Sequence, residues 1–94
     1  MAHQPANGGT IQRALARAKA VKQKYQAELL GKKNVVGVGL GFKIVAGQIS
    51  DEIAIIVNVR QKTDASALPA EDVIPAMLDG VPVDVVEVGT FRAQ

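Results

Sequence analysis

Apolar residues recur with helical spacing over the first third of the chain. Between residues 10 and 30 the sequence is rich in Ala, Lys, Gln and Arg, which all favour helices, and Gly31 follows directly. The apolar positions share one face of the helical wheel, at Ile11, Ala14, Leu15, Ala18, Val21, Tyr25 and Leu29. The pattern predicts a helix over 10–30 with Thr10 as its N-cap, preceded by a flexible tail at 1–9.

The period changes to two in the middle of the chain. In "NVVGVGLGFK", residues 34–43, bulky residues alternate with glycines, and "EIAIIVNVR", residues 52–60, repeats the alternation after the polar stretch "AGQISD". Two such runs joined by a short turn predict a β-hairpin. One side carries Val36, Val38, Leu40, Phe42, Ile53, Ile55 and Val57. The other side, which we call the glycine face, carries Gly37, Gly39, Gly41, Ala54 and Ile56.

The last third of the chain predicts a connection and one more strand. Residues 61–78 contain Pro69 and Pro75 and suggest at most a single helical turn near 75–78, whereas Asp79-Gly80 is a strong turn signal. The stretch "VPVDVVEVG", residues 81–89, predicts a strand. Its valines change sides at 85–86, which indicates either a β-bulge or burial on both faces.

These elements predict an α+β fold. A long N-terminal helix packs on a small sheet of at least three strands, in the order α-β-β-(short α)-β, within a single domain over 10–94. We expect the helix to cover the bulky side of the hairpin. The glycine face is then left to the 63–78 connection, to a second subunit, or to both.

The glycines of residues 37–41 do not form a phosphate-binding loop. Such a loop needs G-x-G-x-x-G between a strand and a helix, so that the anion meets the helix N-terminus. Here the spacing is G-x-G-x-G, residue 42 is Phe, and a second strand follows. Glycine weakens a strand by about 0.5–1 kcal/mol relative to Ala, so three of them on one face indicate a close approach of another backbone.

Composition narrows the classes of function. Apolar residues make up 48% of the 94-residue chain but aromatic residues only 3%, and there is no cysteine, which excludes disulfides and cysteine-rich zinc sites. Residues 1–33 hold seven basic residues against one acidic, and residues 34–94 hold four against eight. No stretch approaches the roughly 20 apolar residues of a membrane span, and no signal peptide is evident, so we expect a cytoplasmic protein without membrane contact.

Few residues suggest chemistry. The single histidine, His3, lies in the predicted tail, and the two serines, Ser50 and Ser66, have neither a nucleophile elbow nor a nearby histidine. The carboxylate pairs Asp51-Glu52 and Glu71-Asp72 fall beside turns, where acidic residues are ordinarily solvated. We therefore expect no enzyme, no metal site and no cofactor.

The basic helix is the strongest sign of a binding partner other than the chain itself. Its anion-binding candidates are Arg13, Arg17, Lys19 and Lys24, and binding to phosphates would weaken steeply with salt. The helix has no interleaved aromatic residues for stacking on bases and no second helix to complete a helix-turn-helix. Nucleic acid is thus the less favoured alternative.

Three stretches resemble a known family: "NVVGVGLGFK", "DEIAIIVNV" and above all "LPAEDVIPAMLDGVPVDVVEVG". They are similar to a small bacterial domain of uncharacterised function, and to the region that precedes the trypsin-like protease-related portion of plant narrow-leaf-type proteins. The resemblance covers roughly residues 30–90 and consists of strands and turns. It carries over no catalytic residue and implies at most a stand-alone accessory or assembly module.

The favoured interpretation is a non-enzymatic structural or interaction module that self-associates into a homo-oligomer, with a separate protein partner left open. Edge strands and the glycine face would supply the contacts, with Gly37, Gly39, Gly41, Ala54 and Ile56 as interface candidates. Two alternatives remain open: an anion or nucleic-acid binder that uses the basic helix, and a regulator of a separately encoded protease-like protein.

Overall fold

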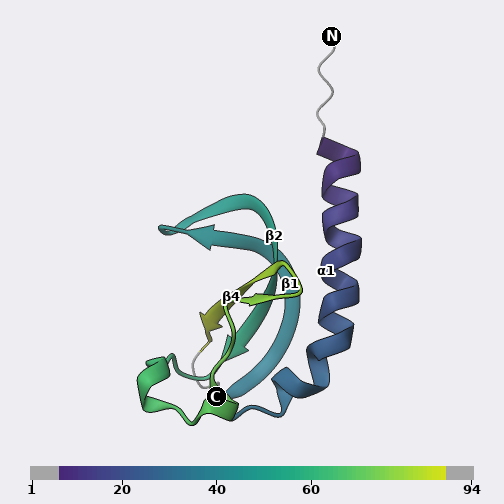
Figure 1. Cartoon of the computed structure of the whole chain (residues 1–94). Helices are drawn as coiled ribbons and strands as arrows, with labels where there is room; N and C mark the ends of the chain where they lie inside the picture. Colours follow the sequence, from purple (N-terminus) through teal and green to yellow (C-terminus); the bar gives the residue numbers. More distant parts are fainter. Residues whose placement is uncertain (1–6, 89–94) are drawn as a thin grey trace, which may run out of the picture.

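The protein folds as one long helix packed across a small sheet (Figure 1). The computed structural model describes residues 7–88, so His3, most of the predicted tail and the last six residues lie outside the described part. The elements are α1 (Asn7–Leu30), β1 (Val35–Val45), β2 (Gln48–Val59), the 3-10 turns η1 (Ala65–Ala67) and η2 (Ala70–Asp72), β3 (Met77–Leu78) and β4 (Val81–Glu87). The predicted α+β class is confirmed.

The apolar stripe of helix α1 is buried only in the second half of the helix. Ala18, Val21 and Leu29 are buried against the sheet, and Tyr25 packs beside them. The helix starts three residues before the predicted Thr10, a difference close to the usual scatter in assigning helix ends, and it ends at Leu30 as predicted.

Gly31 closes the helix without a left-handed conformation. Its N–H donates to the carbonyls of Ala27 and Glu28, at 3.0 and 3.2 Å. The left-handed residue of this loop is Asn34, at φ 79°, and its side chain bonds in both directions with the backbone of Gln61. Asn34 thereby ties the start of β1 to the end of β2.

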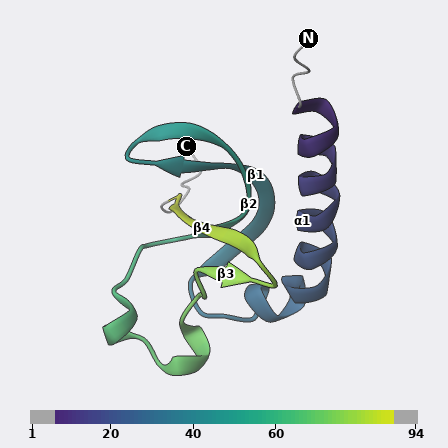
Figure 2. The same ribbon diagram turned by 45° about the horizontal axis from the view of Figure 1, so that its top comes forward.

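The sheet has four strands in the order β1-β2-β4-β3. β1 and β2 form the predicted antiparallel hairpin, β2 and β4 run parallel, and the short β3 pairs antiparallel with β4 (Figure 2). The predicted helical turn at 75–78 is wrong, because Asp79 and Gly80, at φ 49° and 83°, form a two-residue turn that pairs Leu78 with Val81. The helical turns lie earlier, at η1 and η2.

The core lies between α1 and the bulky side of the sheet, as predicted. Ile53, Ile55, Val57 and Val59 of β2 are all at most 9% exposed, and Val81 and Val83 of β4 extend this buried layer. The prediction is wrong for Val36 and Phe42, which are 46% and 43% exposed. A register shift leaves Val36 as an extra residue in β1, so that Val35 pairs with Val59 and packs against the core instead.

The change of sides in β4 comes from burial on both faces. Pairing with β2 runs without a break from Ile55↔Val83 to Val59↔Glu87, so there is no bulge at 85–86. Val83 lies in the core, and Val86 is half-buried on the opposite face. Of the two alternatives that the sequence left open, the structure selects this one.

Candidate interaction surfaces

The glycine face is assembled as the sequence predicts. Gly37, Gly39 and Gly41 of β1 pair with Asn58, Ile56 and Ala54 of β2, and each pair points away from the core. β4 continues this face, because Asp84 pairs with Ile56 and Val86 with Asn58. The face therefore spans three strands on the side of the sheet opposite α1.

One end of the glycine face is covered by the chain's own hairpin. β1 and β2 bow away from α1 in both views (Figures 1 and 2), and the backbone N–H of Ile44 reaches the Oδ2 atom of Asp84 at 3.0 Å, although β2 lies between their strands. Ala54 is 0% exposed beneath this curl. A methyl group at Gly41 would lie only 3.2 Å from Cγ1 of Ile56, so Gly41 permits the close packing.

The other end of the face is open. A methyl group at Gly39 would meet no atom within 4 Å, and one at Gly37 would make an ordinary contact with the Asn58 side chain, at 3.5 Å. Ile56, Asn58 and Val86 are half-buried here. We call these five residues the open glycine face. Among the interface candidates, Gly37, Gly39 and Ile56 belong to it, Gly41 lies at its closed end, and Ala54 is inaccessible.

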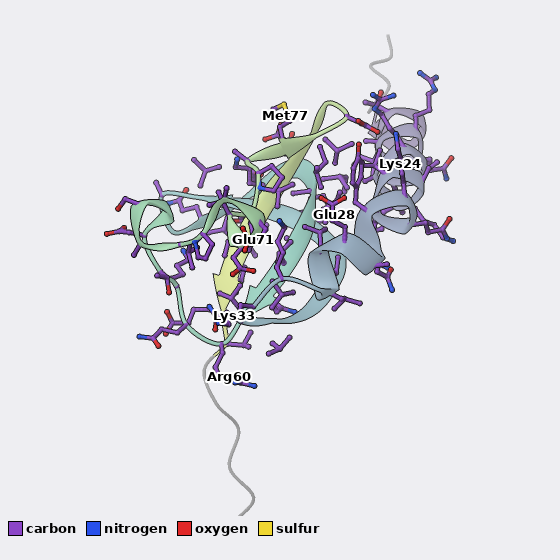
Figure 3. All side chains as sticks on the ribbon, turned by 60° about the horizontal axis from the view of Figure 1, so that its bottom comes forward. Lys24, Glu28, Lys33, Arg60, Glu71 and Met77 are labelled. Carbon is purple, nitrogen blue, oxygen red and sulfur yellow. The ribbon has the colours of Figure 1, made fainter. Side chains whose placement is uncertain are left out.

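The connection between β2 and β3 lies on the other side of the sheet. Ile74 packs against the core. The backbone carbonyl of Glu71, a residue of this connection labelled in Figure 3, accepts a hydrogen bond from the Lys32 ammonium group at 2.7 Å. The Oδ1 atom of Asp72 accepts one from the backbone N–H of Lys33 at 3.0 Å. A hollow of about 300 Å³ separates the connection from the end of the sheet, and core-side residues such as Val59 and Val85 line it. The 63–78 segment therefore leaves the open glycine face uncovered.

The tip of the β1–β2 hairpin exposes apolar side chains. Phe42, Ile44, Val45 and Ile49 are between 43% and 75% exposed. Just beyond them the pairing is irregular, since residues 50–52 of β2 stand opposite Lys43 alone. The Ser50 hydroxyl bridges this irregularity, because it donates to the Lys43 carbonyl at 2.6 Å and accepts from the backbone N–H of Glu52 at 3.1 Å.

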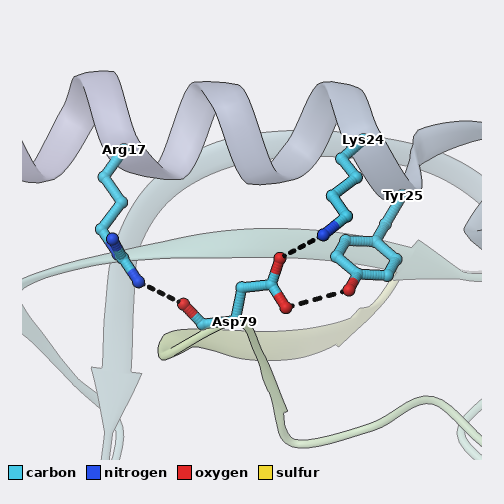
Figure 4. A network of polar contacts seen from close by, with 4 residues as sticks. All are labelled: Arg17, Lys24, Tyr25 and Asp79. Carbon is cyan, nitrogen blue, oxygen red and sulfur yellow. Dashed lines mark hydrogen bonds and ion pairs between the residues drawn. The ribbon is translucent and has the colours of Figure 1, made fainter.

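The basic helix uses two of its cations to hold the β3–β4 turn. Arg17 donates to the carbonyl of Asp79 at 2.6 Å, Lys24 contacts its Oδ2 atom at 2.9 Å, and the Tyr25 hydroxyl donates to its Oδ1 atom at 2.9 Å (Figure 4). The Lys24 ammonium group also lies 5.2 Å from the centre of the Tyr25 ring. We call this set of four residues the Asp79 clamp.

The clamp shifts the titration of its charged members. The hydrogen bond from Lys24, supported by that from Tyr25, lowers the pKa of the Asp79 carboxyl below its ordinary value. The hydrogen bond to Asp79 raises the pKa of Lys24 in turn. Since the Lys24 and Asp79 side chains are 62% and 38% exposed, water screens the pair, and its role is mainly to position the turn against α1.

The other two anion-binding candidates do not extend this group. Lys19 follows Arg17 by two residues and so lies about 200° further around the helix axis. Arg13 shares the flank of Arg17 but stands one turn nearer the N-terminus. The four candidates are therefore not gathered into one basic site. The sequence missed Asp79 as the partner, although the spacing of Arg17 and Lys24 already placed both on one flank of the helix.

No chemical site emerges from the remaining candidates. The Ser50 hydroxyl is engaged by backbone groups, and Ser66 is exposed. Within residues 7–88, no three His, Cys, Asp or Glu side chains are close enough to hold a metal ion. Nor does any helix in this range have the length and apolar character needed to cross a membrane.

One helix packed on a four-stranded mixed sheet defines a small α+β fold. The family described as NARROW LEAF 1 N-terminal domain matches residues 13–88. The chain therefore belongs to this family, and the match includes the second half of α1 and every strand. No curated protein matches the chain.

Proposed function

We propose that this protein is a non-enzymatic structural module that self-associates into a homo-oligomer through its open glycine face and the outer edge of β1. The observation that carries the proposal is the difference between two glycines. Gly41 is needed for the hairpin's own packing, whereas a side chain at Gly39 would have free space. Because glycine weakens a strand by about 0.5–1 kcal/mol, its presence at 39 is explained if a second backbone approaches there.

The edge of the sheet supports the same proposal. β1 is eleven residues long, and its outer side has no strand partner within residues 7–88. It ends in the exposed apolar side chains of Phe42, Ile44 and Val45. A long edge strand with apolar side chains readily pairs with another strand, and between its two register shifts β1 is regular from Gly37 to Phe42. The other edge, β3, has only two residues.

The alternative of an anion or nucleic-acid binder is weaker. Arg17 and Lys24 already serve the Asp79 clamp, and the four cations do not form one surface. A monomeric binder of this kind would also not explain why the edge of β1 and the open glycine face are exposed.

The test is the solution mass of the wild type and of Gly39→Val, measured by light scattering after size exclusion at low and high salt. The side chain at 39 has room within its own chain, so the variant should fold, and its circular dichroism should match the wild type. We expect the wild type to form a discrete oligomer that persists at high salt, because its contacts are apolar, and Gly39→Val to have a smaller mass.

Gly39→Ala is the matched control, because it adds one methyl group and should weaken assembly less than valine. A wild type that is monomeric at both salts would refute the proposal. So would an oligomer whose mass does not change in Gly39→Val, because the glycine face would then lie outside the interface.

A further inference from the structure

The N-terminal half of α1 extends past the sheet that its second half covers. Every residue from Thr10 to Arg17 is exposed, and burial begins abruptly at Ala18, which is 1% exposed. Figure 1 shows these first turns standing beyond the sheet. Yet the apolar stripe continues into them, with Ile11 37% and Leu15 43% exposed. Among the residues that the structure describes, nothing buries this apolar face of the helix.

A groove runs between this projecting half of α1, the start of β2 and the β3–β4 turn. The volume of the groove is about 800 Å³, which is large enough for a row of side chains from a partner. Ile11 and Ala14 line it from the helix, and Ile53 and Val81 line it from the sheet. Apolar residues therefore line the groove on both its helix side and its sheet side, next to the polar Thr10 and Ser50.

The rim of the groove carries negative charge. Asp51 and Glu52 line its sheet side, and both are exposed. The only ion pair within residues 7–88 joins Lys24 to Asp79, so neither carboxylate has a cationic partner there. Arg17 also lines the groove, but its guanidinium group donates to the carbonyl of Asp79. An apolar groove with an acidic rim fits an amphipathic basic helix.

We propose that this groove binds the N-terminal half of α1 from a second copy of the chain, in a two-fold arrangement in which the two α1 helices cross at Ala14. This half of α1 has the required chemistry: the apolar Ile11 would enter the partner's groove, and Arg13 would lie against the acidic rim. The same two surfaces face each other twice, as an isologous dimer requires. The inference rests on the proposed self-association and adds a second contact to it.

The crossing at Ala14 can be tested by a disulfide, because the chain has no cysteine of its own. Helix axes pack about 8–10 Å apart and Cα atoms lie about 2.3 Å from each axis, so Cα atoms at a crossing come within roughly 3.4–5.4 Å. The upper part of that range suits a disulfide. The variant Ala14→Cys should therefore form a covalent dimer under mild oxidation.

Ala16→Cys is the matched control. Ala16 is also exposed, but it lies about 200° further around the helix axis, on the side away from the groove. Two cysteines held together in a dimer experience an effective concentration near millimolar, so at about 10 μM protein Ala14→Cys should cross-link roughly 100-fold faster than Ala16→Cys. Equal rates for the two variants would overturn the proposal, as would the absence of a covalent dimer from Ala14→Cys.

Charge exchange tests the orientation. In the Ala14→Cys background, Arg13→Glu should slow cross-linking, and the further changes Asp51→Arg and Glu52→Arg should restore it. A triple exchange that leaves the rate as low as in Arg13→Glu alone would refute the contact between Arg13 and the acidic rim.

The same variants separate this inference from the proposed function. If Gly39→Val lowers the mass but Ala14→Cys does not cross-link, the groove contact is refuted and the glycine-face assembly stands. If Ala14→Cys cross-links selectively and Gly39→Val leaves the mass unchanged, the groove contact stands and the glycine-face assembly is refuted.

Discussion

Replacing Gly39 and Gly41 by valine, one at a time, is expected to change the stability of the monomer in different ways. The two glycines lie on the same strand and the same face, two residues apart. The entropic gain from removing a glycine and the β-propensity of valine are therefore nearly equal at both sites and cancel in the comparison. What remains is the space available to the new side chain.

That space gives the size of the difference. At Gly39 a methyl group meets no atom within 4 Å, whereas at Gly41 it would lie 3.2 Å from Cγ1 of Ile56, closer than the roughly 3.5–4.0 Å of a favourable carbon contact. Overpacking of this kind costs about 1–3 kcal/mol. We expect Gly41→Val to be less stable than Gly39→Val by this amount, and in a domain of this size each kcal/mol corresponds to about 4–8 °C in Tm.

The assay is urea unfolding followed by circular dichroism, at a dilution at which light scattering shows monomers. Dilution matters because self-association would stabilise whichever variant still assembles. The double variant Gly41→Val with Ile56→Ala should show a favourable coupling, since the shortened side chain makes room for the valine. Equal stability of the two single variants, or a more stable Gly41→Val, would mean that the hairpin does not curl over its glycine face as described.

Three further changes probe the rest of the fold. Leu29→Ala should lower the free energy of unfolding, measured by heat or urea, by about 3–5 kcal/mol, because Leu29 is only 1% exposed. The adjacent Leu30 is 43% exposed, so Leu30→Ala should change it by no more than about 0.5 kcal/mol. Similar losses in the two variants would contradict the packing of α1. Asn34→Ala should lower the free energy of unfolding by about 1–3 kcal/mol in the same assay, because alanine disfavours φ 79° and lacks the hydrogen bonds to Gln61. Asn34→Gly should recover the part of this loss that comes from the backbone conformation. Asp79→Asn keeps a residue that tolerates the left-handed turn but removes the charge. Because folding lowers the pKa of Asp79, the wild type should have a larger free energy of unfolding than this variant above about pH 4, and the difference should vanish as the pH falls through the lowered pKa. A difference in unfolding free energy that persists in acid would show that the charge does not stabilise the clamp.

Local sequence patterns predict most of the elements because their causes are local. The period of two in β1 and β2 gave the hairpin and its two faces, and the Asp79-Gly80 pair gave the turn before β4. The wrong predictions arise where pairing with a distant strand determines the structure of a residue. Leu78 becomes a strand residue because Val81 pairs with it, and Val36 leaves the core because β1 has one residue more than β2 at that point.

The surfaces were harder to predict, because each depends on how distant segments meet. The sequence showed a basic helix but not that Asp79 would occupy Arg17 and Lys24. It showed a glycine face but not the curl that buries Ala54 and brings Ile44 to Asp84. A helical wheel likewise treats the apolar stripe of α1 as uniform. The sequence gives no sign that the sheet covers this stripe only from Ala18 onward.

Two self-association surfaces on one chain have a consequence for the size of the assembly. An isologous contact through the α1 groove closes on itself and gives a dimer, and the glycine face lies on the side of the sheet opposite α1. Because the two surfaces do not overlap, both can be occupied at once, and the assembly must then exceed two subunits. Removing either surface alone, by Gly39→Val or by Ile11→Asp, should leave the smaller species that the remaining contact forms. Only the two changes together should give a monomer.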